Sequence, residues 1–173
     1  MRLIHLTFIN LCMLLLLSCE SDSGTIQPLS QDDLQGKWFL SELNANQPVD
    51  LNNDGNGSTD LTTETDCFDT MSIKFDNDSY RFSYPKIEFT GENDQTLICN
   101  DTINEGTYQL SDQTLTATTI VDGTAYTENV AIELTNDRLK FRITSTQVSE
   151  YLNLSTVENE NSDLEFLEFV FEK

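Results

Sequence analysis

The sequence predicts an all-β domain: an eight-stranded antiparallel up-and-down barrel with one short helix. From residue 36 onwards, apolar and polar residues alternate with a period of two, which is the pattern of a sheet buried on one face. Short turn sequences separate the alternating runs, and they favour consecutive hairpins over long crossings. Strands joined in this way can close into a barrel whose interior is filled by side chains or holds one small ligand.

The individual elements follow from the same alternation. Strands are expected near residues 36–43, 70–76, 79–90, 104–110, 114–121, 124–135, 138–145 and 164–172. The turns between them are Asn77-Asp78, Ser111-Asp112-Gln113, Asp122-Gly123 and Asn136-Asp137, residue types that accept the positive φ of tight hairpins. The short helix is expected near residues 58–66, and residues 146–163 are expected to form a longer loop before the last strand.

Composition narrows the possible partners and activities. The chain has 30 acidic and 9 basic residues, for a formal net charge of −21. Nucleic acids and anionic membrane surfaces both require a basic surface, so neither is an expected partner of the domain itself. The one histidine, His5, lies in the apolar N-terminal segment. Histidine-dependent catalytic triads and histidine zinc sites are therefore not expected, and we predict no enzyme activity and no catalytic residues.

The N-terminus has the pattern of an export signal. Residues 1–17 combine a positively charged start with an apolar run that is too short to span a bilayer comfortably. The run ends in Leu16-Leu17-Ser18-Cys19, which resembles the lipobox of bacterial lipoproteins. The resemblance implies cleavage after Ser18 and a diacylglyceryl group on the thiol of Cys19. The alternative is an ordinary signal peptide with a chance cysteine, or a buried apolar helix.

These observations divide the chain into a signal peptide at residues 1–18, a flexible tether at 19–33 that begins with the lipidated Cys19, and a barrel domain at 34–173. Two or more acyl chains on Cys19 would anchor the protein stably to a membrane. Glu20 directly follows the lipidated residue, which by resemblance to lipoprotein sorting rules implies retention in the outer membrane. Whether the domain faces the periplasm or the cell surface is left open.

The start of the barrel domain carries a short family pattern. Leu34-x-Gly36-x-Trp38 opens the first strand, and a meander follows through the rest of the chain. This resembles the lipocalin or calycin pattern, and more closely the small lipocalin-like lipoproteins of Gram-negative bacteria. The resemblance implies that Trp38, the single tryptophan, packs under the closed end of the barrel. The insertion at residues 44–66 departs from the animal lipocalins.

The expected function is binding. Trp38, Tyr80, Phe82 and Tyr84 are aromatic residues that could line a cavity, although an aromatic stripe at strand spacing can equally be ordinary core. We expect an envelope binding module that holds a small apolar or amphipathic ligand in its calyx. The alternative is an accessory lipoprotein of an envelope complex, with a protein partner and a barrel filled by its own side chains.

Two cysteines, Cys67 and Cys99, remain after removal of the signal peptide and lipidation of Cys19. In an exported domain we expect them to form a disulfide, the alternative being two free buried thiols. On the chain-entropy estimate, closing this loop stabilises the fold by about 3.7 kcal/mol.

The segment from Asp50 to Leu61 has the spacing of an EF-hand-type calcium loop. Oxygen-bearing side chains stand at loop positions 1, 3 and 5 (Asp50, Asn52, Asp54), followed by a glycine at position 6. Asn56 at position 7 can offer its backbone carbonyl. The alternative is a turn-rich surface loop in which these residues only satisfy the backbone.

The calcium loop departs from the EF-hand pattern at position 12, where Leu61 replaces the bidentate glutamate. Asp60 or Glu64 would have to complete the coordination shell. We therefore expect a weak structural calcium site of the extracellular kind, with a dissociation constant on the order of 10⁻⁴ to 10⁻³ M.

The lipobox prediction can be tested by removing the thiol. Cys19→Ser should leave the protein unlipidated and move it from the membrane fraction to the soluble fraction, because no acyl chain can then be attached. Fractionation in high salt with immunodetection measures this. A Cys12→Ser variant, whose cysteine lies inside the apolar run, should remain in the membrane fraction. Sedimentation of Cys19→Ser with membranes would contradict the prediction.

Overall fold

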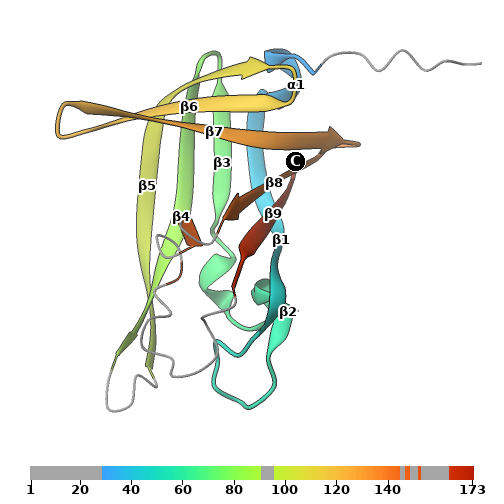
Figure 1. Ribbon diagram of the computed structural model, residues 1–173, viewed down its shortest axis with the longest axis vertical. Coiled ribbons are helices and arrows are strands. Elements are labelled where there is room, and N and C mark those ends of the chain that lie inside the picture. Colours follow the sequence, from blue (N-terminus) through green and yellow to red (C-terminus); the bar gives the residue numbers. More distant parts are fainter. Residues whose placement is uncertain (1–28, 91–95, 145–146, 149–151, 153–163) are drawn as a thin grey trace, which may run out of the picture.

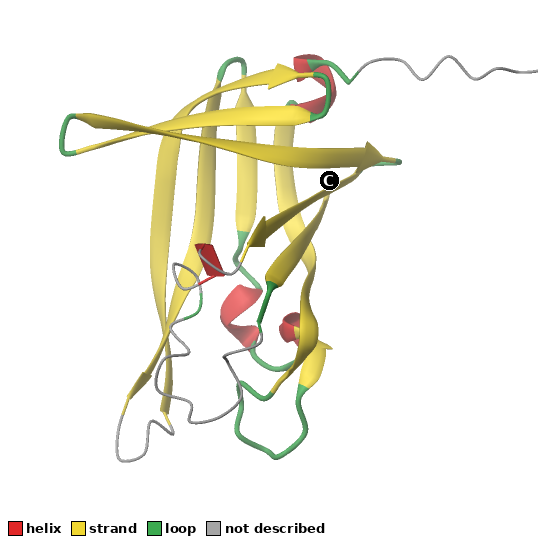
Figure 2. Cartoon of the chain, viewed as in Figure 1, coloured by secondary structure: helices red, strands yellow, loops and turns green. Residues whose placement is uncertain are grey.

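The computed structural model describes residues 29–90, 96–144, 147–148, 152 and 164–173. They form a closed antiparallel β-barrel (Figure 1, Figure 2). The wall runs in the order β1 (Gly36–Val49), β3 (Ser72–Asp76), β4 (Ser79–Thr90), β5 (Thr96–Ser111), β6 (Thr114–Val121), β7 (Thr124–Thr135), β8 (Arg138–Thr144) and β9 (Phe166–Glu172). Because β9 pairs back with β1, these eight strands close, and the predicted up-and-down barrel is confirmed.

The four hairpin turns predicted from the sequence are observed in the structure. Asn77, Asp112, Asp122 and Asn136 all have positive φ, between 48° and 55°, and each stands directly after a strand. Such backbone angles match the twist of two antiparallel strands, and Asn and Asp accept them at low cost. The turn chemistry therefore explains why β3 pairs with β4, and why β5, β6, β7 and β8 pair in succession.

The strand β1 is the seam of the barrel, because it pairs with three other strands in succession. Its first residues pair with β3, its middle from Phe39 to Ala45 pairs with β9, and its end pairs with the short strand β2 (Ser58–Asp60). The register with β9 shifts between Leu40 and Glu42. A bulge of this kind bends a strand and increases its twist, which allows β1 to leave one neighbour and join the next.

The end of the barrel near the N-terminus is closed by the helix α1 (Gln31–Leu34) and the residues beneath it (Figure 1). Trp38 is fully buried there, and its indole Nε1 donates a hydrogen bond to the carbonyl of Leu34 at 2.7 Å. Lys173 covers the same ring, with its Nζ 4.4 Å from the ring centroid. The expected position of Trp38 under the closed end is thus observed. The last residues of the predicted tether belong to α1 rather than to extended chain.

Side chains next to α1 connect it to two hairpins. The Nε2 atom of Gln35 donates to the hydroxyl of Tyr108 at 2.8 Å, and its Oε1 accepts from the backbone N–H of Asn77 at 2.8 Å. Tyr108 is buried, and this burial raises the pKa of its phenol. Hydrogen bonds from Ser30 lower the pKa of the Asp33 carboxyl at the start of α1. These contacts stabilise the closed end as one unit.

The opposite end of the barrel differs from the sequence prediction. The helix expected near residues 58–66 is not formed; instead β2 is followed by two 3₁₀ helices, η1 (Leu61–Thr63) and η2 (Asp66–Phe68). Leu61 and Phe68 are buried, so each short turn contributes one apolar residue to the core. Residues 58–60 pair with the end of β1 instead, through Asn44↔Asp60 and Val49↔Ser58, and a chain extended in this way cannot also be helical.

The predicted disulfide between Cys67 and Cys99 is confirmed. It joins η2 to β5, with a distance of 5.8 Å between the two Cα atoms.

The strand β5 begins at Thr96, eight residues before the start expected from the sequence. All of residues 96–105 are exposed or half-buried, so no buried apolar alternation marks them as a strand. Pairing with β4 along its whole length holds them extended.

Gly106 marks the point where β5 first pairs with β6. A Cβ atom on this residue would overlap the carbonyl oxygen of Thr118 and lie 3.0 Å from Cε1 of Tyr80. Since backbone atoms of a paired strand cannot easily move, only glycine allows the two strands to approach this closely.

Gly106→Ala should therefore destabilise the fold by about 3 kcal/mol or more, because the added methyl group collides with backbone and not with a flexible side chain. Urea denaturation of the mature domain measures the change. The neighbouring Thr107 is exposed, and Thr107→Ala should change the free energy of unfolding by only about 0.5 kcal/mol. Equal midpoints for the two variants would contradict the close approach.

Candidate ligand-binding cavity

The barrel encloses a cavity of about 350 Å³ between its strands. Six strands contribute side chains to it, and alternate residues of each strand face inwards, as period-two alternation requires. The lining consists of Ile73, Phe75, Tyr80, Phe82, Asn104, Leu115, Ala117, Thr119, Val121, Tyr126, Glu128, Val130, Ile132, Leu139, Phe141 and Ile143. Most of these are aliphatic or aromatic, so the interior suits an apolar group.

The cavity is bounded at both ends of the barrel by packed core. Trp38, Leu34 and Tyr108 are buried at the end near α1. Leu51, Leu61 and Phe68 are buried at the end that carries β2 and the 3₁₀ helices, together with Leu152, which forms a bridge to Ile87. Access from either end would require this core to be displaced.

The side wall of the barrel is less completely closed than its two ends, because two pairs of neighbouring strands are paired over only part of their length. The strands β5 and β6 pair from Gly106↔Thr119 to Ser111↔Thr114, so residues 96–105 of β5 have β4 as their single described neighbour. The strands β7 and β8 pair over four residues, from Ile132↔Phe141 to Thr135↔Arg138. Among the described strands, the far part of the β6–β7 hairpin therefore pairs only with itself, and it extends to the left in Figure 1.

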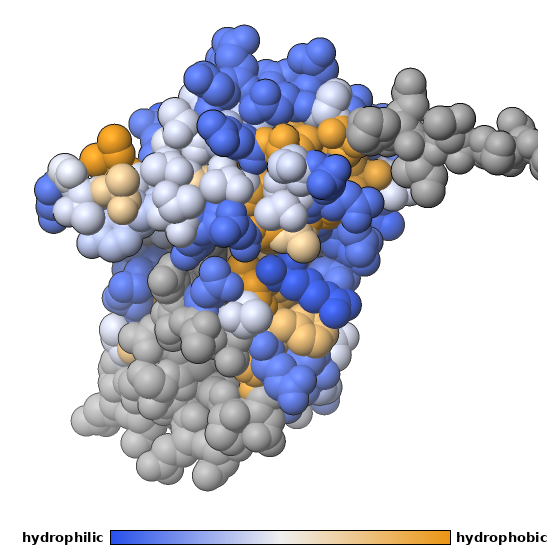
Figure 3. All heavy atoms as spheres, turned by 45° about the horizontal axis from the view of Figure 1, so that its top comes forward, coloured by the Kyte–Doolittle hydropathy of each residue, from blue (hydrophilic) through white to orange (hydrophobic). Residues whose placement is uncertain are grey.

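Beside this hairpin, the cavity borders a hollow on the outer surface. Asn104, Thr119 and Val121 line both the cavity and a hollow on the outer surface. Val121 and Tyr126, at the end of the hairpin, are more than half exposed. Glu128 lines the cavity and is also exposed. We call Asn104, Thr119, Val121, Tyr126 and Glu128 the mouth. Figure 3 shows hydrophobic surface at the tip of the hairpin, among hydrophilic residues.

Few polar groups face the cavity, and some of them bond to one another. The hydroxyls of Tyr80 and Thr119 form a hydrogen bond between β4 and β6. The amide of Asn104 donates to the hydroxyl of Tyr84 at 3.3 Å. The first bond joins β4 to β6 and the second joins β5 to β4, and the rest of the lining is mainly apolar.

Two of the four aromatic residues proposed from the sequence line the cavity, namely Tyr80 and Phe82. Tyr84 stacks on Phe82 with ring centroids 4.9 Å apart, and it lies outside the lining. Trp38 belongs to the closed end. The lining residues of β6 and β7, from Leu115 to Ile132, were not predicted as part of a site, although the alternation of apolar residues in these strands indicates an inward face.

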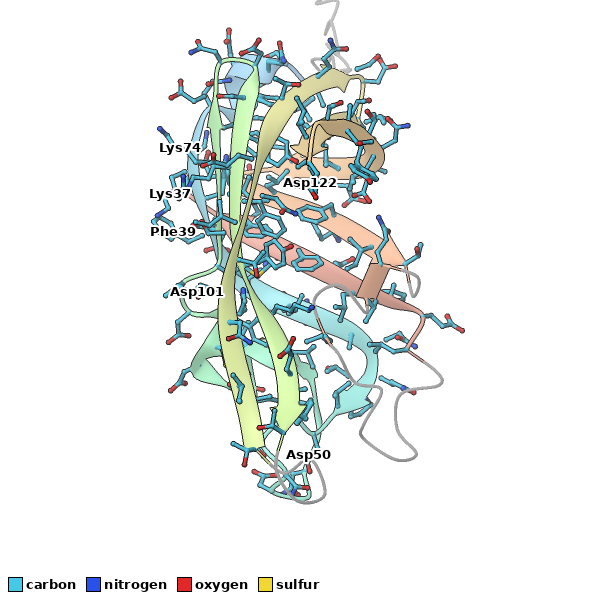
Figure 4. All side chains as sticks on the ribbon, turned by 90° about the vertical axis from the view of Figure 1, so that its left-hand side faces the viewer. Lys37, Phe39, Asp50, Lys74, Asp101 and Asp122 are labelled. Carbon is cyan, nitrogen blue, oxygen red and sulfur yellow. A yellow bond between two sulfur atoms is a disulfide. The ribbon has the colours of Figure 1, made fainter. Side chains whose placement is uncertain are left out.

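The candidate calcium loop lies at the opposite end of the molecule from the helix α1, where Figure 4 labels Asp50. The carboxylate of Asp50 accepts hydrogen bonds from the backbone N–H groups of Asp54 (3.1 Å) and Gly55 (2.8 Å). The Oδ1 atom of Asn52 accepts from the same Asp54 N–H at 2.9 Å, and Asp54 Oδ1 accepts from Asn56 N–H at 2.8 Å. The loop thus brings the side-chain oxygens of its first half together.

The residues expected to complete the calcium shell have other contacts. Asp60 caps η1 and accepts from the backbone N–H groups of Thr62 and Leu43. Glu64 is buried, and its Oε2 accepts from the backbone N–H of Leu51 at 3.2 Å. Within the described residues, no three Asp, Glu, His or Cys side chains form a group that could hold a metal ion. Of the predicted calcium donors, Asp50, Asn52, Asp54 and Asn56 are the ones that hydrogen bonds within the loop hold together.

The lipidation candidate, Cys19, lies outside the described residues, as do the signal peptide and most of the tether. Across the ranges that are described, no helix has the length and apolar character needed to cross a membrane.

A closed eight-stranded antiparallel barrel around an apolar cavity is the architecture of calyx-type binding proteins. Residues 34–141 match the family described as Lipocalin-like domain, and the chain belongs to this family. No curated protein matches the chain. The crystal structure of an uncharacterized protein from Bacteroides eggerthii DSM 20697 is similar over 81% of this chain and 98% of that chain, with 14% sequence identity and a TM-score of 0.40.

Proposed function

We propose that this protein is a lipid-anchored binding module of the bacterial envelope that holds one small apolar or amphipathic ligand inside its barrel. The observation that carries the proposal is the cavity. Its volume of about 350 Å³ falls in the range of small-molecule sites, which is roughly 300–1,000 Å³. Its lining also has the composition of such sites: many apolar and aromatic side chains with a few polar groups.

The anchor is proposed from the sequence, on the lipobox at Leu16-Leu17-Ser18-Cys19 and the polar tether after it. A tether of this kind would keep the barrel near the outer membrane, where amphipathic molecules are concentrated. The acidic surface of the chain supports the same arrangement, because a net charge of −21 keeps the domain off anionic lipid and in solution at the end of its tether.

A second function is supported by the outer surface. Ile103, Ile120 and Val121 are exposed and line the hollow beside the β6–β7 hairpin. Exposed apolar residues gathered in this way favour contact with another protein. An accessory role in an envelope complex is therefore the alternative proposal, and it does not require an occupied cavity.

Ligand binding can be tested by filling the cavity from within. An environment-sensitive neutral fluorophore should bind the mature wild-type domain with saturation, at one molecule per chain. Ala117 lines the cavity, whereas Ala131 is exposed on the outer face of the neighbouring strand. Ala117→Trp should abolish binding because the indole occupies the ligand volume, and Ala131→Trp should bind as the wild type does.

Thermal melts should show that both tryptophan variants are folded. Saturable binding that persists in Ala117→Trp would contradict a site inside the barrel. Absence of saturable binding in the wild type would favour the accessory role.

We also propose that the Asp50–Asn56 segment binds calcium weakly and that the ion stiffens the loop. The support is the convergence of the Asp50, Asn52 and Asp54 oxygens within a single tight loop. A carboxylate has about four lone-pair sites, so an oxygen that accepts a backbone N–H can still ligate a cation. Hard oxygen ligands of this kind suit Ca²⁺, which takes 6–8 of them; water would supply the remainder.

Calcium at millimolar concentration should raise the melting temperature of the wild type, since an ion that binds the folded loop stabilises the folded state. The variant Asp50→Ala/Asp54→Ala should melt at the same temperature with calcium and with chelator, even if its loop is less stable. Asp101→Ala, which removes an exposed carboxylate from β5, should keep the calcium response. Identical wild-type melts in calcium and chelator would refute the proposal.

A further inference from the structure

Glu128 stands out among the residues that line the cavity. In the part of the chain that the structure describes, it is the one Asp, Glu, Lys, Arg or His of the lining. It lies on the inner face of β7, directly opposite Ala117 of β6, and it remains exposed. No described basic side chain forms an ion pair with it, although eight ion pairs are found elsewhere among the described residues.

An aromatic residue lies on the same face of β7 as this carboxylate. Tyr126 lies two residues before Glu128 on the same inner face of β7, opposite Thr119 at the mouth. The residue is more than half exposed. The face of an aromatic ring attracts cations, and a carboxylate beside such a ring is a suitable site for an ammonium group. Apolar side chains such as Val130 and Ile132 continue the same face towards the barrel interior.

The other charged side chains near the mouth do not neutralise the negative charge of Glu128. Arg81 and Glu105 face each other across β4 and β5 and form an ion pair, so together they add no net charge to the outer hollow. Asp122, in the turn between β6 and β7, lines the same hollow (Figure 4). With a net charge of −21 over the whole chain, the field at the mouth attracts cations and repels anions.

We infer that the ligand of this cavity has an apolar body and a positively charged head, as in an alkylammonium amphiphile, and that Glu128 selects the head at the mouth. This inference rests on the proposed ligand-binding function. The apolar body enters between β5 and the β6–β7 hairpin and fills the interior. The ammonium group stays at the mouth, where it contacts the carboxylate of Glu128 and the ring of Tyr126 and remains partly hydrated.

The inference can be tested with ligands of equal length and different heads. Decylamine, decan-1-ol and decanoate should compete with the neutral fluorophore on the mature domain at neutral pH and low salt. The expected order of affinity is amine, then alcohol, then carboxylate. The preference for amine over carboxylate should decrease as salt is added, because exposed charges are screened.

Substitutions in β7 distinguish the effect of the Glu128 carboxylate on ligand affinity from the effect of the net charge of the chain. Glu128→Gln should reduce the affinity for decylamine by about fivefold, which is the upper range for an ion pair at an exposed site, and leave decan-1-ol unchanged. Glu128→Lys should reverse the preference towards decanoate. Glu133 lies on the outer face of β7, so Glu133→Gln removes the same charge and should keep the wild-type order.

The possible outcomes are distinct. If the fluorophore and decan-1-ol bind but Glu128→Gln and Glu133→Gln lower the amine affinity equally, the selectivity belongs to the net charge; the role of Glu128 is then refuted while ligand binding stands. If decanoate binds to the wild type as tightly as decylamine does, the inference that the ligand carries a positive charge is refuted. If none of the probes binds, the proposed function and this inference are both overturned.

Discussion

The pairing of β1 with β9 turns a meandering sheet into a barrel, and the other features of the fold depend on it. An open sheet of eight strands would leave two edges with unpaired backbone groups, whereas closure satisfies them internally. A bulge in β1 makes the closure possible by bending the strand from β3 towards β9. Phe169 and Phe171 of β9 are then fully buried, and they stack with Phe141 of β8 inside the barrel.

Closure at this seam also determines where a ligand can enter. Both ends of the barrel are filled, one around Trp38 and the other around Leu51 and Leu61. The long pairing of β4 with β5 and the short pairing of β5 with β6 leave the opening in the side wall instead. Gly106 lies at the point where these two pairings meet, and its contact with the backbone of Thr118 positions the hairpin that carries Val121 and Tyr126. The mouth is thus a consequence of strand register.

The cavity and the mouth differ in chemistry, and the difference suits an amphipathic ligand. For the proposed ligand, the interior offers apolar surface away from water, and burial there would supply most of the binding free energy. The mouth is exposed and carries a carboxylate and a phenol, which supply selectivity more than affinity. The calcium loop is at another part of the molecule, so the two proposed sites can be tested independently (Figure 4).

Local chemistry was sufficient to predict the eight strands of the barrel wall and four of the turns between them. Alternating residues define which face of a strand is buried, and residues such as Asp122-Gly123 and Asn136-Asp137 define where the chain reverses. The closed barrel, the disulfide between Cys67 and Cys99, and the lining positions of Tyr80 and Phe82 could therefore be anticipated. The tertiary structure alone decided the rest. It replaced a helix near residues 58–66 with β2 and two 3₁₀ turns, extended β5 back to Thr96, and placed Glu128 at an opening in the wall. These features arise from pairing between distant segments, and the free energy of such pairing cannot be read from any single stretch of sequence.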